Sequence, residues 1–408
     1  MSATHPARFQ KRTLKWVVFI FSLNLGLGLG FCALFFPTVG EITSGLDPDG
    51  YGAAGRSWME SGRFEAIDKA PLYPGFVALV SKIQGGFSLS GIQFAQCLVS
   101  ALTCVLLLLI YQRTLDGSEA SARIASLVCA VFPLSLWYIP RLWTETLLTL
   151  VIACYTWALI HFLQKPTALN AILVGLMIGL SALCKGIALI LLPGSIILAA
   201  LLIRRDTWKW LALISLAALA LIAPWTWRNW RLTGEFLPIH TGSGYNFYMG
   251  NGFTRYWSKA PFSYVELKAL TVQDMDRLYA ASATPPDSPL EQDHFLLQAG
   301  LQEIIEYPLL LLKKICIQSI TFWYLAGDFS KSLLTGMLQI PIVILGLNGA
   351  VQAARRRSWA LILLAPVIGI MSVSVLVSSF GRLSATIMPY MIGLAVYGVV
   401  RCTGRLNA

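Results

Sequence analysis

A long apolar run, WVVFIFSLNLGLGLGFCALFF at residues 16–36, is followed by a polar segment, LDPDGYGAAGRSWMESGRFEAIDKAPLYPGF at residues 46–76. The apolar run exceeds the roughly 18 residues that a helix needs to cross the hydrocarbon core of a bilayer. A secretory signal peptide has a shorter apolar region and a small-residue cleavage site, so we expect an uncleaved first membrane span. The polar, acid-bearing segment then emerges at the far end of that span.

The composition indicates a protein embedded in a membrane. Of 408 residues, 56% are hydrophobic and 12% are charged, against roughly 25% charged residues in soluble proteins. The net charge of +11 comes from basic residues at the ends of apolar runs, where they orient the helices. We therefore expect a lipid bilayer as a partner and no nucleic acid. The cysteines show neither the spacing of a disulfide framework nor that of a zinc site.

The apolar runs predict an all-α polytopic fold with about ten or eleven membrane helices and a small extracytoplasmic domain. Basic residues before the first run keep its start in the cytoplasm, so the acidic segment lies outside. Residues 308–325 either cross the membrane or lie in its interface. The interfacial position is preferred because it brings the arginines at 355–357 to the cytoplasm. The ten spans then cover residues 16–36, 92–111, 122–139, 146–163, 169–183, 187–203, 210–227, 332–351, 359–377 and 387–400.

Three parts follow from this pattern. Residues 1–227 form an N-terminal transmembrane module that carries the first extracytoplasmic loop at 37–90. Residues 228–307 are polar and form an extracytoplasmic domain, with a helix that starts at Asp287 or Ser288. Residues 308–408 supply the interfacial helix and the C-terminal spans.

Acidic side chains at the outer ends of the spans are the first candidates for chemistry. Asp47 and Asp49 precede Tyr51 and suit a general base or a metal ligand, although Asp-Pro-Asp-Gly is also good turn chemistry. Glu145 begins a span after Thr144. A carboxylate so close to the apolar core needs a partner or a task, but it also suits a helix start.

Basic side chains at the same face are the second group. Lys69, in KAPLYP, suits a phosphate or a snorkelling position at the interface. Lys185 lies between two apolar runs. Arg228 and Arg382 lie where spans meet the outer surface, where guanidinium groups either bind phosphate or anchor the helix beside tryptophans.

The stretch GSGYNFYMGNG at residues 242–252 combines glycines, asparagines and aromatic residues. Such a stretch either wraps a sugar or phosphate or forms a tight turn. Its candidate ligand contacts are Tyr245, Asn246 and Asn251. His161, His240 and His294 form no ligand pattern, and the sequence assigns them no role.

The order of these motifs resembles the C-type glycosyltransferase superfamily. The branch with protein O-mannosyltransferases and the lipid A aminoarabinose transferase-like enzymes is the most similar. The motifs that carry the resemblance are Asp-x-Asp-x-Tyr, KAPLYP, the Thr-Glu pair at a span mouth, LCKG, PWTWRNW with YNFYMGN, and Gly-Arg before the last span. The resemblance implies a glycosyltransferase core and a polyprenyl-phosphate-linked sugar as donor.

The resemblance also assigns roles to individual positions. Asp47, four residues before Tyr51, is similar to the catalytic carboxylate of the first loop, and Asp49 competes with it for that role. Lys69 resembles the lysine of the KPPL motif that contacts the lipid phosphate, with Ala70 in place of the first proline. Glu145 resembles the second acidic position, and Glu145 and Tyr51 are assigned to the substrate. Lys185, Arg228 and Arg382 resemble the basic residues assigned to the donor phosphate.

The expected activity is that of an inverting glycosyltransferase. It would move a hexosyl or pentosyl group from a polyprenyl-phosphate sugar to a lipid, glycan or protein hydroxyl at the periplasmic face of a bacterial inner membrane. If a divalent metal takes part, Asp49 and Glu145 are its candidate ligands. The alternatives are a ligase or polymerase of lipid-linked glycans and a transporter or flippase, which would show repeats and midplane polar residues.

Overall fold

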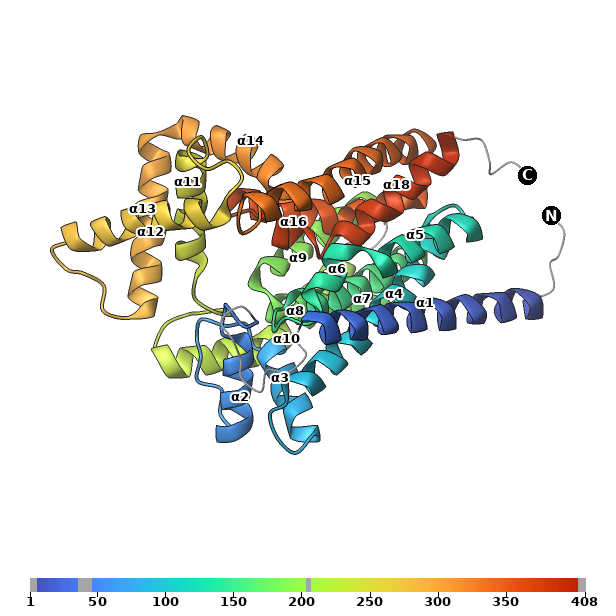
Figure 1. Cartoon of the computed structure of the whole chain (residues 1–408), viewed down its shortest axis with the longest axis horizontal. Coiled ribbons are helices and arrows are strands. Elements are labelled where there is room, and N and C mark those ends of the chain that lie inside the picture. Colours follow the sequence, from blue (N-terminus) through green and yellow to red (C-terminus); the bar gives the residue numbers. More distant parts are fainter. Residues whose placement is uncertain (1–5, 36–45, 203–206, 403–408) are drawn as a thin grey trace.

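The computed structural model describes residues 6–35, 46–202 and 207–402, and the regular structure in these ranges is helical. Long helices lie side by side along the longest axis of the molecule (Figure 1). The N-terminal end of α1 and the C-terminal end of α18 lie at the same end of this bundle, as an even number of crossings requires. The long helices are α1 (Pro6–Phe35), α4 (Leu89–Thr114), α7 (Glu145–Gln164), α10 (Thr207–Thr233) and α15 (Phe329–Arg356).

The all-α polytopic fold is confirmed, but not every predicted span forms a helix long enough to cross a membrane. Six helices of the described chain are long and apolar enough to cross a membrane, and they match six of the ten predicted spans. The predicted spans at 169–183, 187–203 and 387–400 form shorter apolar helices. They are α8 (Ala168–Cys184), η1 (Gly186–Ile190) with α9 (Leu191–Leu202), and α18 (Met388–Cys402).

The predicted span at 122–139 is divided in two. It forms α5 (Glu119–Val131) and α6 (Pro133–Tyr138), with Phe132 in an extended conformation between them. Proline has no N–H to continue the hydrogen bonding of α5 and disfavours a helical residue before it, so the helix ends at this point. Hydrophobicity alone therefore located the segment but did not reveal the break.

A second break separates α13 (Pro289–Glu306) from α14 (Pro308–Tyr324). The two helices bend by 107° and together pass as one broken span or as a re-entrant loop. Lys314 and Gln318 are buried on α14, which packs against α11 (Ser243–Tyr256), α15 and α16 (Leu364–Leu376). The interfacial position of residues 308–325 remains a prediction.

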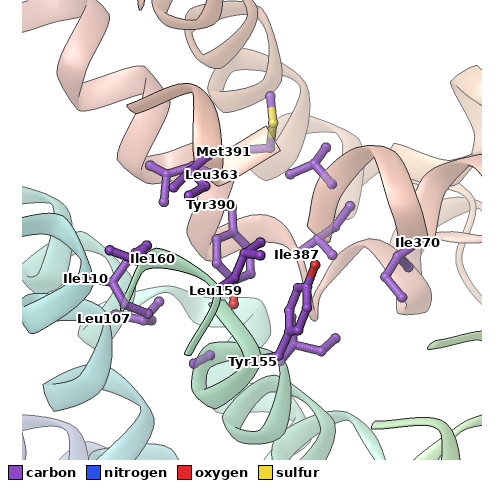
Figure 2. Packing of buried hydrophobic residues seen from close by; sticks show 14 of the residues in the cluster. Leu107, Ile110, Tyr155, Leu159, Ile160, Leu363, Ile370, Ile387, Tyr390 and Met391 are labelled. Atoms are coloured by element: carbon purple, nitrogen blue, oxygen red, sulfur yellow. The ribbon is translucent and has the colours of Figure 1, made fainter. Parts of the chain in front are cut away.

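The main core joins the N-terminal and C-terminal helices. Figure 2 shows Tyr390 of α18 pointing into the cluster that also contains Leu159 of α7. Tyr111 on α4 donates a hydrogen bond to the carbonyl of Pro389 at 2.6 Å. A Cβ on Gly349 would lie 1.9 Å from the Leu394 carbonyl, so glycine lets α15 and α18 pack backbone to backbone. Small residues permit this approach between membrane helices.

The region predicted to be extracytoplasmic forms a separate cluster at the far end of the bundle (Figure 1). It contains α11, α12 (Tyr264–Ala281) and α13. These helices lie at the opposite end of the molecule from the N-terminal end of α1 and the C-terminal end of α18 (Figure 1). Tyr248, Phe253 and Leu296 are among its buried residues. Ser288 begins α13 in a capping box with Glu291, which confirms the predicted helix start. This cluster stands next to the end of the bundle where the acidic loop emerges.

Candidate functional site

A buried ion pair forms the centre of the candidate site. Glu145 is the first residue of α7, and its side chain is 2% exposed. Arg382, from the short helix α17 (Gly381–Ser384), donates hydrogen bonds to both carboxylate oxygens of Glu145. The Nε–Oε1 distance is 2.6 Å and the Nη2–Oε2 distance is 3.0 Å. Lys185, at the end of α8, lies 2.8 Å from Oε1. A buried carboxylate requires such partners, because desolvating a lone charge is strongly unfavourable.

Arg382 also connects this pair to the acidic loop. Its Nη1 lies 2.5 Å from Oδ2 of Asp49, whose side chain is 41% exposed. The guanidinium stacks over the ring of Trp143 at 4.0 Å. The planar group thus has each of its edges occupied and one face covered, which fixes its orientation.

Asp47 is held separately from Asp49. Its Oδ2 accepts a hydrogen bond from the backbone N–H of Ala53 at 2.8 Å, at the start of α2 (Tyr51–Ser61). Its Oδ1 is buried and receives no hydrogen bond from any described residue. Burial raises the pKa of Asp47, although backbone N–H groups of Gly52, Ala53 and Tyr51 oppose this shift. The two aspartates therefore have different environments: one buried oxygen of Asp47 has no hydrogen-bond partner among the described residues, whereas Asp49 bonds to Arg382.

Two backbone features bring Asp47 to this place. The N–H of Leu142 donates to the Leu46 carbonyl at 2.9 Å, which joins the loop to the segment before α7. Gly52 lies so close to this segment that an added Cβ would sit 2.3 Å from Cδ1 of Leu142 and 3.0 Å from Oδ2 of Asp47. Glycine is therefore required for the close approach of α2.

Lys69 belongs to the same group. It lies in the loop between α2 and α3 (Leu72–Ile83), and its ammonium stands over the ring of Tyr51 at 5.8 Å. It forms an ion pair with the more exposed Asp68. Burial raises the pKa of Tyr51, and the charges of Asp49 and Glu145 add to this effect while Arg382 opposes it. Tyr51 therefore contacts Lys69 and is close enough to the central ion pair to be affected by its charges.

The structure thus brings together five of the predicted charged residues from four stretches of the chain, and Asp47 and Tyr51 lie beside them. The ion-paired residues are Asp49, Lys69, Glu145, Lys185 and Arg382. Acidic and basic groups at one end of a membrane bundle can bind a phosphate and accept a proton from a hydroxyl.

Arg228 lies beside this group and contacts the loop that carries Lys69. It donates hydrogen bonds to the carbonyls of Phe64 and Ala66, the latter at 3.1 Å. Its guanidinium stacks over the rings of Trp225 at 4.6 Å and Phe64 at 5.3 Å. The predicted phosphate ligand is therefore bonded to backbone carbonyls in this structure.

The predicted contacts in the glycine-rich stretch have other surroundings. Asn251 is fully buried and bonds to the Gly300 carbonyl and to Glu303, each at 3.0 Å, and accepts from Lys314 at 2.8 Å. These bonds connect α11 to α13 and α14, and the ligand contact of Asn251 remains a prediction. Asn246 bonds to the Gly242 carbonyl, and the half-buried Tyr245 packs against the extracytoplasmic cluster.

Three residues near the site were not among the predicted site residues. Trp143 lies under Arg382, as described above. His240 lies against the turn after Lys185, because a Cβ on Gly186 would be 3.0 Å from its Nε2, and burial lowers its pKa. Tyr264, at the start of α12, has its pKa raised to about 12, first by burial and then by Tyr245 and Asp49. Trp143 is next to the Thr-Glu motif, so its place in the site could have been predicted from the sequence. The sequence around His240 and Tyr264 contains no motif that indicates a place in the site.

An apolar groove opens beside the loop that carries Lys69. Its volume is about 410 Å³. It borders α2, α3, α7, α8 and α10, and Pro71, at one of its edges, is two residues from Lys69. Its lining residues are Trp58, Pro71, Leu72, Gly75, Phe76, Leu79, Leu147, Leu183 and Trp225.

The predicted metal ligands do not form a metal centre here. In residues 6–35, 46–202 and 207–402, no group of three histidine, cysteine or acidic side chains could hold an ion. Asp49 and Glu145 both direct oxygens to Arg382, and Lys185 adds a second positive charge at Glu145. This donor set is already neutralised by cations, so it does not fit a divalent metal.

Comparisons with known proteins give a family match for part of the chain and similar folds. Residues 68–227 match the family model described as dolichyl-phosphate-mannose-protein mannosyltransferase. No curated protein gives a significant sequence match. The match starts immediately before Lys69 and includes Glu145 and Lys185, whereas Asp47, Asp49 and Arg382 lie outside it.

One solved structure shares the fold, and a second aligns with a lower score. The archaeal oligosaccharyltransferase AglB from Archaeoglobus fulgidus, in complex with an inhibitory peptide and a dolichol-phosphate, aligns with a TM-score of 0.55 and 13% identity over 96% of this chain. The chain spans about half of that enzyme, with 52% of it covered. ArnT from Cupriavidus metallidurans, bound to undecaprenyl phosphate, aligns with a TM-score of 0.44 and 16% identity over 95% of this chain and 78% of ArnT.

Proposed function

We propose that this chain is an inverting glycosyltransferase of the C-type superfamily that uses a polyprenyl-phosphate sugar; the match of residues 68–227 to the dolichyl-phosphate-mannose-protein mannosyltransferase model supports the proposal. The acceptor is a lipid, glycan or protein hydroxyl at the extracytoplasmic end of the bundle. The observation that carries this proposal is the meeting of Arg382 with both Asp49 and Glu145, because it joins the first loop, α7 and the C-terminal helices in one site.

The donor fits the groove and the adjoining cations. A polyprenyl tail is apolar and suits the groove that begins at Pro71, while its phosphate suits the ammonium of Lys69. Arg382 and Lys185, which are bonded to Glu145, provide further positive charge in the same site. The dolichol-phosphate in the AglB complex supports a lipid phosphate as donor.

Asp47 is the proposed general base. The acceptor hydroxyl gives its proton to the available Oδ1, and its oxygen attacks the anomeric carbon from the face opposite the phosphate. The bond from the anomeric carbon to the phosphate oxygen breaks, so the sugar inverts and a lipid phosphate leaves with the electron pair. Cations placed where this charge develops stabilise the transition state. A positioned base contributes roughly a factor of 10²–10⁴ in rate.

The parts of the chain have corresponding roles in this proposal. Residues 1–227 hold the donor and the base, residues 228–307 face the acceptor, and residues 308–408 contribute Arg382. In this proposal the site lies at the periplasmic side of a bacterial inner membrane, and the positive-inside pattern of the sequence supports an extracytoplasmic position. Asp49 then holds Arg382 and Glu145 holds both Arg382 and Lys185, so neither carboxylate needs to act as a base.

Proteoliposomes with a radiolabelled polyprenyl-phosphate sugar test the proposal. Transfer produces free polyprenyl phosphate together with a labelled acceptor, and Asp47→Asn abolishes both products. A transporter would move the donor across the membrane with its sugar–phosphate bond intact. A ligase or polymerase would need a longer lipid-linked glycan as donor. Movement of intact donor without cleavage by the wild-type protein would contradict the proposal.

A further inference from the structure

We propose that the C-terminal end of α10 is a positioning device for Lys69, with residues 237–241 as a strap that links the two. The proposal rests on the function above, in which Lys69 binds the donor phosphate. Trp225 also lines the groove assigned to the polyprenyl tail, whereas Arg228, Asn229 and Thr226 are not among the lining residues of that groove. The device acts by fixing the backbone of the loop at 64–69.

Arg228 provides the first attachment. Its guanidinium donates to the carbonyls of Phe64 and Ala66, five and three residues before Lys69. The carbonyl of Asn229's side chain accepts a further hydrogen bond from Arg228 at 2.8 Å. Because Trp225 and Phe64 contact the guanidinium as well, its fork is held in one orientation over the loop. Arginine is suited to this task because its five N–H groups are rigid and planar.

Asn229 fixes the strap to α10. Its side chain is fully buried and donates to the carbonyls of Leu237 at 3.0 Å and Ile239 at 2.9 Å. The indole of Trp225 donates to Ile239 at 2.8 Å, and the hydroxyl of Thr226 donates to Pro238 at 2.9 Å. Four hydrogen bonds from one helix end therefore determine the position of residues 237–239.

The strap then reaches both lysines of the site. The N–H of Thr241 donates to the carbonyl of Ile67 at 2.8 Å, two residues before Lys69. His240, the residue between, lies against Gly186, which follows Lys185. A single segment thus borders the backbone of Lys69 and the backbone of Lys185, although these lysines are far apart in the sequence.

Such support matters because a lysine side chain is long and flexible. Its ammonium reaches a defined point only when the backbone that carries it is fixed. A displacement of about 1 Å at a binding group can reduce the rate about 10²-fold. Loosening the strap should therefore weaken donor binding and leave the acceptor and the base unchanged.

A double-mutant cycle in the full-length protein tests the proposal. Arg228→Lys keeps the positive charge but removes the planar guanidinium that bonds to Phe64 and Ala66. Thr226→Val removes the hydrogen bond to Pro238 and keeps the shape of the side chain. Arg228→Lys should raise the KM for a polyprenyl-phosphate sugar about tenfold, within the range expected for misplaced binding groups. The kcat at saturating donor and the KM for the acceptor should stay within about twofold. Thr226→Val should change the donor KM in the same direction and by less.

The exposed Arg231, on the same helix end, provides the matched control as Arg231→Lys and should leave every constant unchanged. In a Lys69→Ala background, Arg228→Lys should add nothing further, because both act on one contact. An additive effect would overturn the positioning role, since Arg228 would then act on the donor by itself. If Lys69→Ala leaves the donor KM unchanged, the phosphate assignment in the proposed function fails, and the positioning role fails with it. A lower kcat without a change in KM would indicate a general loss of folded protein and also contradict the proposal.

Discussion

Arg382 holds Glu145 through both carboxylate oxygens, at 2.6 and 3.0 Å, across 237 residues of sequence. This pair connects the N-terminal helices to the C-terminal ones at the end of the bundle where the first loop emerges. Lys185 contributes a second cation on the same carboxylate. Asp49 bonds to Arg382 as well, so the two cations and the two carboxylates of this centre balance one another.

Glu145→Ala should destabilise the protein strongly. Removing one partner from a buried ion pair typically costs about 3–5 kcal/mol, because the remaining charge stays buried without compensation. Thermal unfolding in detergent measures the effect. Glu60→Ala is the matched control, because its pair with Arg56 is exposed on both sides and contributes little. Equal unfolding temperatures for the two variants would contradict a central role for Glu145.

Asp47→Asn and Asp49→Asn should have different effects. We expect Asp47→Asn to reduce kcat by roughly 10²–10⁴, because the base is lost. Asp49→Asn removes a partner of Arg382 that is half exposed, and we expect turnover to fall no more than about tenfold. Initial rates at saturating donor and acceptor measure both. A larger loss in Asp49→Asn than in Asp47→Asn would reverse the two roles.

The pH dependence of kcat should report on Asp47. A general base must be ionised, so the rate falls when the pH drops through its folded pKa. Burial raises that pKa, so the acidic limb should lie above the ordinary carboxyl value of about 3.9. A pH–rate profile of the wild-type protein locates the limb. A limb at or below the ordinary value would show that the acting carboxylate is not the buried Asp47.

The same shift predicts a gain in stability for Asp47→Asn at neutral pH. A carboxyl with a raised folded pKa binds its proton more tightly in the folded protein than in the unfolded one. Its contribution to stability is thus present at low pH and is lost as the pH rises through the folded pKa. The neutral asparagine avoids this loss, so its unfolding temperature should exceed that of the wild type at pH 7. An advantage that is instead larger at low pH would contradict the assignment.

Gly52→Ala should displace Asp47 without removing it. The added Cβ would overlap Leu142 and press on Oδ2 of Asp47, so we expect kcat to fall by about tenfold or more. Gly86→Ala is the control, because nothing lies within 4 Å of a Cβ there. Comparable activity in both variants would show that the close approach of α2 to Leu142 does not matter for the site.

The sequence predicted the parts of the site better than their contacts. Apolar length identified the spans, and charges at their ends identified Glu145, Lys185 and Arg382, because a charge near the bilayer is conspicuous. Which charges meet depends on tertiary packing, and no local pattern encodes it. Arg228 illustrates the limit: its position at a span end suggested a phosphate, while the fold supplies the carbonyls of Phe64 and Ala66.

Breaks in the helices were equally hard to predict. Pro133 is a local signal for the division of α5 and α6, although hydrophobicity continues through it. Asn251 lies in a stretch rich in glycine and aromatic residues, yet its partner Lys314 comes from a helix that is far away in sequence. Composition suggested a ligand contact there, and the buried lysine that bonds to Asn251 could not be seen from the stretch itself.

The most direct test of the account is the release of polyprenyl phosphate from a sugar-bearing donor, measured in parallel with donor binding. The wild-type protein should release one lipid phosphate for each sugar transferred. Asp47→Asn should bind the donor as well as the wild type and release at least about 100-fold less. Undiminished release by Asp47→Asn, or tight donor binding by the wild type with no cleavage under any acceptor, would contradict it.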